Sequence, residues 1–281
     1  MVSRCFDEVY GDAGAKVTRT EVAALTDWLT NTSHDDLLQR QRAAELAFRQ
    51  LGITFAVYGE EAAAERIIPF DIVPRIFSAS EWRRLEEGLT QRITAINAFL
   101  CDIYGEQRIL AAGAIPAEII LTNPQFRSEL VGVRPPHDVW AHIAGIDLVR
   151  TSAEDFWVLE DNVRTPSGVS YMLENREAMI RLCPELFRSF RVAAVDSYPD
   201  LLHEMLRSVA PAHAQGNPLC VILTPGQYNS AYYEHSFLAD TIGIDLVEAA
   251  DLMVDQDKVW MRTITGLVQV DVVYRRIDDD L

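Results

Sequence analysis

Asp147, Glu160 and Asn162 are the side chains whose types and spacing best suit a metal ion. Asp147 lies in the apolar run 145–150, and the other two end the apolar run 156–162. Carboxylate and amide oxygens are hard ligands, and Mg²⁺ commonly takes one or two protein carboxylates and fills its octahedron with water and substrate phosphates. If these three side chains converge, they can form a magnesium site.

An antiparallel hairpin is the element that would bring them together. Both runs have the short apolar pattern of strands, and the polar segment 151–155 between them is short enough for a hairpin connection. Side chains on a strand alternate between its faces, so Glu160 and Asn162 point one way and Asp161 points the other. Folding the hairpin would place Asp147 opposite the first pair.

Ordinary turn chemistry explains the same residues without a metal. The chain continues from Asn162 through Pro166 and Ser167 to Gly168, and Asp, Asn, Pro, Ser and Gly all favour turns. Acidic side chains at strand ends are also usually solvated. From the residues alone, both the metal site and the plain turn stay open.

Two longer strings, 159–176 and 273–280, resemble the circularly permuted ATP-grasp type 2 family, which is described as glutathionylspermidine synthase-like. The first begins Leu-Glu-Asp-Asn-Val-Arg-Thr-Pro-Ser-Gly, and the second reads Val-Tyr-Arg-Arg-Ile-Asp-Asp-Asp. The resemblance covers nearly the whole chain. ATP-grasp ligases join a carboxylic acid to an amine or thiol through an acyl phosphate made from ATP. The resemblance therefore implies Mg²⁺ and ATP as cofactors, and small-molecule or peptide carboxylates and amines as substrates.

The same resemblance implies roles for single residues. Asp147 and Glu160 would hold Mg²⁺, with Glu160 bridging two ions and Asn162 completing the shell of one. Arg164 would lie near the transferred phosphate and stabilise charge on the acyl phosphate, as phosphoryl transfer requires mainly positioning and charge neutralisation.

The turn that follows is also part of the implied site. Ser167 and Gly168 would form a cofactor-binding turn whose backbone approaches the substrate. The segment 174–176 belongs to the first family string, and Arg276 and Asp278 belong to the second, but the residues themselves indicate no chemical step for them.

The expected fold class is α+β or α/β, as a partial circularly permuted ATP-grasp. We expect a helix-rich region over 1–135, the metal-binding half over 136–215 and a small pre-ATP-grasp-like α/β domain over 216–281. In the family's permuted order, a nucleotide-clamping half would follow, so the resemblance implies an incomplete chain that binds ATP weakly by itself.

Two other functions fit the same residues. A non-catalytic binding or scaffold module is favoured by the scarcity of lysine, since Lys16 and Lys258 are the only ones. A phosphotransferase could use the same metal site. ADP with an amide, rather than ADP with a phosphorylated product, would identify a ligase.

Further elements follow from local patterns. Ser78 with Glu81 forms a capping-box pattern that predicts a long helix over 80–104, whose apolar stripe from Trp82 to Ile103 we expect to be core. Arg92 is expected on its solvated face. Arg75, between two prolines, is a candidate for contacting an anion.

The last third of the chain predicts an open parallel sheet. Strands over 219–223 and 245–248 flank a helix over 229–242, which is one βαβ unit. A single strand is expected over 267–275, and a short strand or turn over 115–123.

The bulk composition limits the functions that are possible. The net charge of −17 argues against general binding to nucleic acid or anionic membranes, which need a basic face. Four dispersed cysteines without C-x-x-C spacing predict reduced thiols and no zinc site. The sequence shows no targeting pattern and no apolar stretch near the roughly 18 residues that cross a bilayer, so we expect a cytoplasmic protein.

Overall fold

The computed structural model describes residues 6–10, 19–56, 65–214 and 216–277. Asp278 lies outside these residues. Contacts divide the chain into two compact units, one formed by residues 77–166 and the other by 1–76 together with 167–281.

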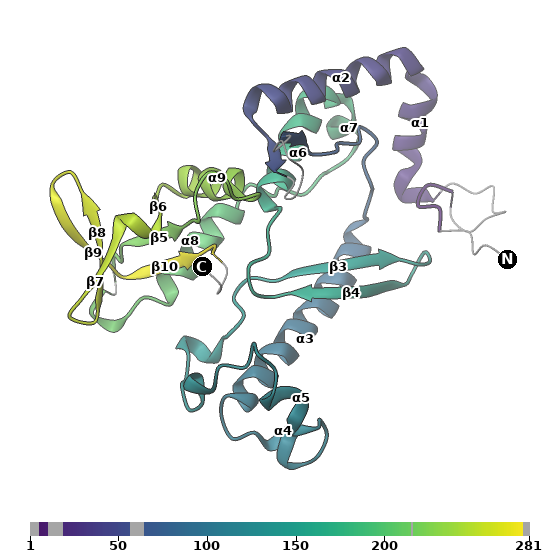
Figure 1. Ribbon diagram of the computed structural model, residues 1–281. Coiled ribbons are helices and arrows are strands. Elements are labelled where there is room, and N and C mark those ends of the chain that lie inside the picture. The colour runs from purple at the N-terminus through teal and green to yellow at the C-terminus, as the bar shows by residue number, and fades with distance from the viewer. Residues whose placement is uncertain (1–5, 11–18, 57–64, 215, 278–281) are drawn as a thin grey trace. The chain divides into compact units, whose positions relative to one another are not determined.

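The fold mixes helices and sheets, which confirms the expected fold class (Figure 1). In the part of the chain described, no helix is long and apolar enough to cross a membrane. The domain boundaries expected from the resemblance stay a prediction.

The unit formed by residues 77–166 is built on one long helix and one hairpin. Its elements are α3 (Ala79–Ile103), α4 (Arg108–Ala111), α5 (Ala117–Leu121), the 3-10 turns η2 (Ser128–Leu130) and η3 (Pro136–Asp138), and the strands β3 (Gly145–Arg150) and β4 (Phe156–Asn162). The segment predicted as a short strand or turn over 115–123 therefore contains a helix. Five residues are too few to show a helical period in the sequence.

The start of α3 confirms the predicted capping box. The Ser78 hydroxyl accepts the Glu81 N–H at 3.2 Å, and the Glu81 carboxylate accepts the Ser78 N–H at 2.8 Å. The pair satisfies backbone donors that the first turn of a helix leaves open.

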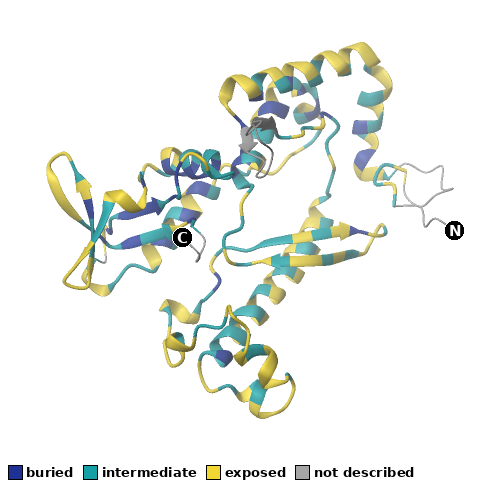
Figure 2. Cartoon of the chain, in the orientation of Figure 1, coloured by how far each residue is buried: buried dark blue, intermediate teal, exposed yellow. Residues whose placement is uncertain are grey.

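The expectation that the apolar stripe of α3 is core is wrong for all of its residues except Ile103, since Ile93, Ile96, Phe99 and Leu100 are half-buried. Ile103 is buried, but Leu85 and Leu89 are half-buried and Trp82 is 58% exposed. Figure 2 shows α3 coloured as half-buried or exposed along most of its length. Leu85 and Leu89 line an open cavity of about 580 Å³ together with residues of the hairpin. A two-stranded hairpin is too small to cover one side of a helix of this length.

The other unit carries the remaining helices and strands. Its elements are η1 (Thr20–Val22), α1 (Ala23–Asn31), α2 (His34–Leu51), β1 (Thr54–Ala56), β2 (Glu65–Ile67), α6 (Val169–Leu182), α7 (Pro184–Ser189), α8 (Tyr198–Ser208), η4 (Ala212–Ala214), β5 (Cys220–Leu223), α9 (Tyr232–Ile242), β6 (Asp245–Val247), η5 (Ala249–Asp251), β7 (Leu252–Asp255), β8 (Lys258–Thr263), β9 (Gly266–Val270) and β10 (Val272–Arg275).

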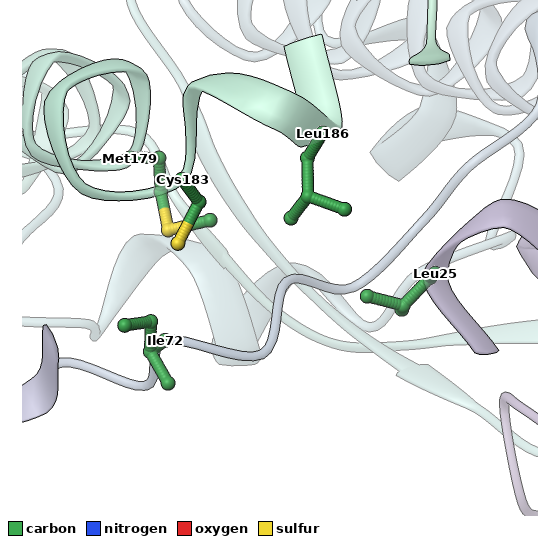
Figure 3. Close-up of a cluster of buried hydrophobic side chains, with 5 residues drawn as sticks. All are labelled: Leu25, Ile72, Met179, Cys183 and Leu186. Atoms are coloured by element: carbon green, nitrogen blue, oxygen red, sulfur yellow. The ribbon is translucent and has the colours of Figure 1, made fainter. Parts of the chain in front are cut away.

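Helices that precede residues 77–166 in the sequence and helices that follow them build one core in this unit. Figure 3 shows part of it, where Leu25 of α1 and Ile72 pack with Met179 of α6, Cys183 and Leu186 of α7. A neighbouring cluster joins α2 to α6. Apolar burial of this kind contributes roughly 25 cal/mol per Å² of surface removed from water.

The C-terminal sheets confirm the predicted βαβ unit and correct its end. β5 pairs in parallel with both β6 and β10, and β7, β8 and β9 form an antiparallel meander. The single strand expected over 267–275 is wrong, because it divides at Asp271 between the two sheets. There the Asp271 carboxylate and backbone N–H both bond to the backbone of Leu219, which redirects the chain toward β5.

Candidate functional site

The β3–β4 hairpin brings together the residues that the sequence selected as metal ligands. Asp147 lies directly opposite Glu160, and Gly145 lies opposite Asn162. The Asn162 amide donates to Glu160 Oε1 at 3.1 Å. Strand alternation predicted that Glu160 and Asn162 share a face, and the observed register places Asp147 opposite Glu160.

A β-bulge decides which acid of the hairpin faces outward. The register shifts between Asp147 and Leu148, so that Leu159 is the extra residue of β4. A bulge inserts one residue and reverses the alternation beyond it. Without the bulge, Asp161 would share the face of Trp157, whereas with it Glu160 does.

The opposite face of the hairpin is tied to α3 by two ion pairs. Near the connection between the strands, the buried Arg150 pairs with Glu81. At the other end, both carboxylate oxygens of Asp161 accept bonds from Arg92 at 2.6 Å. The Arg92 hydrogen bond holds the pKa of Asp161 below its usual range. Arg92 is exposed, as expected for the solvated face of α3, and it also holds the hairpin through Asp161.

The outward face combines free carboxylates with apolar surface. Among the described residues, no cation pairs with Asp147 or Glu160, and both are exposed. Nearby on the hairpin, Trp157 is 66% and Leu159 68% exposed. No group of three or more His, Cys, Asp or Glu side chains that could hold a metal occurs among the described residues, so Asn162 would have to supply the third protein ligand.

Close packing fixes the open end of the hairpin. A Cβ on Gly145 would stand 2.9 Å from Cβ of Pro166 and 3.7 Å from Cβ of Asn162. Only glycine leaves room for both. Arg164, which follows the strand, is exposed and donates to the Gln125 side chain at 3.4 Å.

The turn containing Ser167 and Gly168 belongs to the other unit, where its backbone is held by a buried acid. Gly168 has φ of 116° and precedes α6. Its N–H donates to Glu234 Oε2 at 2.6 Å, and the N–H and hydroxyl of Ser170 donate to the same oxygen at 3.1 Å. A carboxylate from α9 thus occupies the positive end of α6. Ser167 is exposed, and the proposed contacts of Ser167 and Gly168 with a cofactor stay a prediction.

Arg276 balances the charge of this buried acid. Its Nη2 donates to Glu234 Oε1 at 3.1 Å, and its Nη1 donates to the Tyr274 hydroxyl at 3.1 Å. Nearby, burial and Arg276 lower the pKa of His235 to about 4, so its imidazole is neutral at pH 7 and bonds to the Thr224 hydroxyl at 2.8 Å. The residues themselves indicated no role for Arg276, which belongs to the second family string. Its ion pair with Glu234 gives it a structural role.

The structure gives Arg75 a partner, and it reveals an acid that the sequence did not single out. Arg75, a candidate for contacting an anion, pairs with the carboxylate of Glu8 in the structure. Glu234 was not selected at all. The signal for it was an acid inside the apolar part of a predicted helix, but its burial depends on Arg276, which is distant in sequence.

Comparisons with known proteins identify the family of the chain. The family described as circularly permuted ATP-grasp type 2 matches residues 74–281. An uncharacterized protein of Synechocystis sp. is 48% identical over 275 residues, which cover 98% of this chain and 56% of that protein. A Frankia casuarinae protein named "Putative glutamate--cysteine ligase 2-2" is 41% identical over 98% of this chain and 32% of its own length.

A solved structure shows the same fold at low sequence identity. The apo form of a glutathione synthetase-like effector from Globodera pallida matches with a TM-score of 0.50 and 12% identity, over 89% of this chain and 59% of that one. The chain spans about half the length of the Synechocystis relative and of a Mycobacterium tuberculosis relative. From the match over most of its length and from these relatives, the chain belongs to the circularly permuted ATP-grasp type 2 family.

Proposed function

We propose that this chain carries the metal-binding part of an ATP- and Mg²⁺-dependent carboxylate–amine ligase that works through an acyl phosphate. The observation that supports it most is the outward face of the hairpin, where Asp147 opposes Glu160 and Asn162 bonds to Glu160. Like charges directly opposite each other destabilise a hairpin. A divalent cation between the two carboxylates would relieve this repulsion. A plain solvated turn would not need two carboxylates to face each other.

The donor set fits Mg²⁺ in both number and chemistry. Two carboxylates and one amide oxygen leave positions for water and phosphate oxygens, as Mg²⁺ requires. When bound, Mg²⁺ neutralises charge on the transferred phosphate. Asp147 and Glu160 would hold the ion, and Asn162 would complete its shell while fixing the orientation of Glu160.

Other residues of the chain would position the reacting groups. Arg164 is exposed, and we assign it to the developing charge on the acyl phosphate. Ser167 and Gly168 are assigned to contacts with the cofactor and substrate. The Gly168 N–H already donates to Glu234, so it is not available to a ligand. Gly168 would instead leave room for the ligand, because glycine has no side chain.

The metal assignment is tested by titrating Mg²⁺-ATP calorimetrically into this chain and into an Asp147→Asn/Glu160→Gln variant. We expect saturable binding that the variant loses. A matched control is Glu154→Gln, an exposed acid in the connection between the strands. Equal binding by the variant would remove these residues from the site, and absence of binding by the unaltered chain would contradict metal-dependent nucleotide binding by this chain.

The reaction class needs a separate product analysis. With ATP and a panel of acids and amines, a ligase yields ADP and an amide. Hydroxylamine, added in place of the amine, would trap an acyl phosphate as a hydroxamate. ADP with a stable phosphorylated acid would instead identify a phosphotransferase.

A further inference from the structure

A cavity along one face of α6 is lined by Gly168, which the function proposed above uses, and by other residues to which that function assigns no role. Its volume is about 450 Å³, within the range of roughly 300–1,000 Å³ typical of small-ligand sites. The residues that α6 contributes recur at helical spacing: Gly168, Tyr171, Met172, Asn175, Arg176 and Met179. One face of a single helix therefore forms one wall.

The remaining walls are largely apolar. Phe187 and Phe190 line the cavity beside Leu186, and Met179 and Leu186 continue into the buried core shown in Figure 3. Met172 and Val192 are 42% and 44% exposed, which places the opening on their side. The cavity thus offers a rigid aromatic and aliphatic surface with access from solvent.

Two polar side chains project from the helix into this apolar surface. Arg176 Nη1 donates to the Ala193 carbonyl oxygen at 2.6 Å, and its guanidinium lies 5.9 Å from the ring of Phe187. In the described part of the chain, Arg176 has no carboxylate partner and the Asn175 amide has no hydrogen-bond partner. None of the described residues that line the cavity is acidic, and Arg75 at its edge pairs with Glu8.

We propose that this cavity binds the acid substrate of the ligase, specifically a carboxylic acid with an apolar or aromatic body about the size of an N-acylated amino acid. Arg176 is held in place by Ala193 and Phe187 but keeps donors for a carboxylate, and a guanidinium binds that group with charge-assisted bonds. The Asn175 amide donates a further bond. In a chain of net charge −17, this acid-free lining is the feature that favours an anion. The proposal rests on the function proposed above, and it deepens that function by naming the substrate class.

The test measures binding without metal or nucleotide, so that it does not depend on the hairpin. N-acetylphenylalanine and its neutral primary amide are titrated into the chain in EDTA, with binding followed by ligand-detected NMR. We expect saturable binding of the acid below about 10 mM and at least about tenfold weaker binding of the amide. Arg176→Gln should remove most of this preference, and Arg176→Lys should restore part of it.

Two further variants keep the test independent of folding defects. Asn175→Asp adds a negative charge at a side chain with no described partner, and it should weaken acid binding at least about tenfold while leaving amide binding unchanged. Arg181→Gln alters an exposed arginine of α6 outside the cavity and should change neither. Equal binding of acid and amide, insensitivity to Asn175→Asp, or no saturable binding of the acid would each overturn the proposal. Mg²⁺-ATP binding that persists in that case would leave the proposed function standing.

Discussion

Glu234 is 1% exposed and accepts four hydrogen bonds, whereas Asp147 and Glu160 are exposed and face each other across the hairpin. The first acid is fully satisfied by its own chain, and Arg276 balances its charge. The other two have no described cation beside them. This difference teaches how to separate structural from functional acids, because a carboxylate that the fold leaves unneutralised beside another one has capacity for a ligand.

Asp161 is an intermediate case on the same hairpin as the open pair. It is paired with Arg92, but the pair lies at the surface. Acids in these three environments should therefore respond differently when their charge is removed.

The largest effect is expected at Glu234. Glu234→Gln would leave Arg276 buried without its counter-charge, and breaking a buried pair in this way costs about 3–5 kcal/mol. Urea unfolding measures the loss, and Glu204→Gln, an exposed acid of α8, is the matched control. A loss no larger than that of the control would show that the buried pair does not stabilise the fold.

A smaller and pH-dependent effect is expected at Asp161. Arg92 lowers its pKa in the folded state, so the stabilisation is present above the unfolded-state pKa of about 3.9 and is lost as pH falls through the lower folded-state pKa. Asp161→Asn should therefore be less stable than the unaltered chain at pH 7. The difference should shrink in unfolding curves recorded toward pH 3, and a difference independent of pH would contradict the ion pair.

The smallest effect, with the opposite sign, is expected at Asp147. Asp147→Asn removes the repulsion from Glu160 across the strands and should stabilise the metal-free chain by about 0.2–1 kcal/mol. Adding Glu160→Gln to this variant should bring no comparable second gain, because the repulsion is already gone. Unfolding in EDTA measures both variants, and destabilisation by Asp147→Asn would mean that the fold itself uses this carboxylate.

The hairpin illustrates how much of the site the sequence could predict. Without the bulge, Asp147 would lie opposite Leu159, so its opposition to Glu160 did not follow from the two strands alone, whereas the hairpin itself was predictable from two short apolar runs with a five-residue polar connection. The bulge at Leu159 was not, because strand alternation alone does not show an extra residue. Its effect is to decide that Glu160 and not Asp161 shares the face of Trp157.

Other parts of the fold depended on tertiary context. The capping box of Ser78 and Glu81 acts within three residues, and the structure confirms it. The division of the last strand at Asp271 depends on Leu219, and the burial of Glu234 depends on Arg276. Contacts between residues so far apart in sequence leave no local pattern.

The helical core made by segments on either side of residues 77–166 has a consequence for synthesis on the ribosome. Leu25 and Phe48 are made before residues 77–166, but their partners Ala178 and Met179 are made after them. At about 5–20 residues per second, the first helices wait on the order of ten seconds for the segment that covers them. During that interval the apolar faces of the first helices are exposed to chaperones. The unit formed by residues 77–166 can then begin to fold before the unit to which the first helices belong.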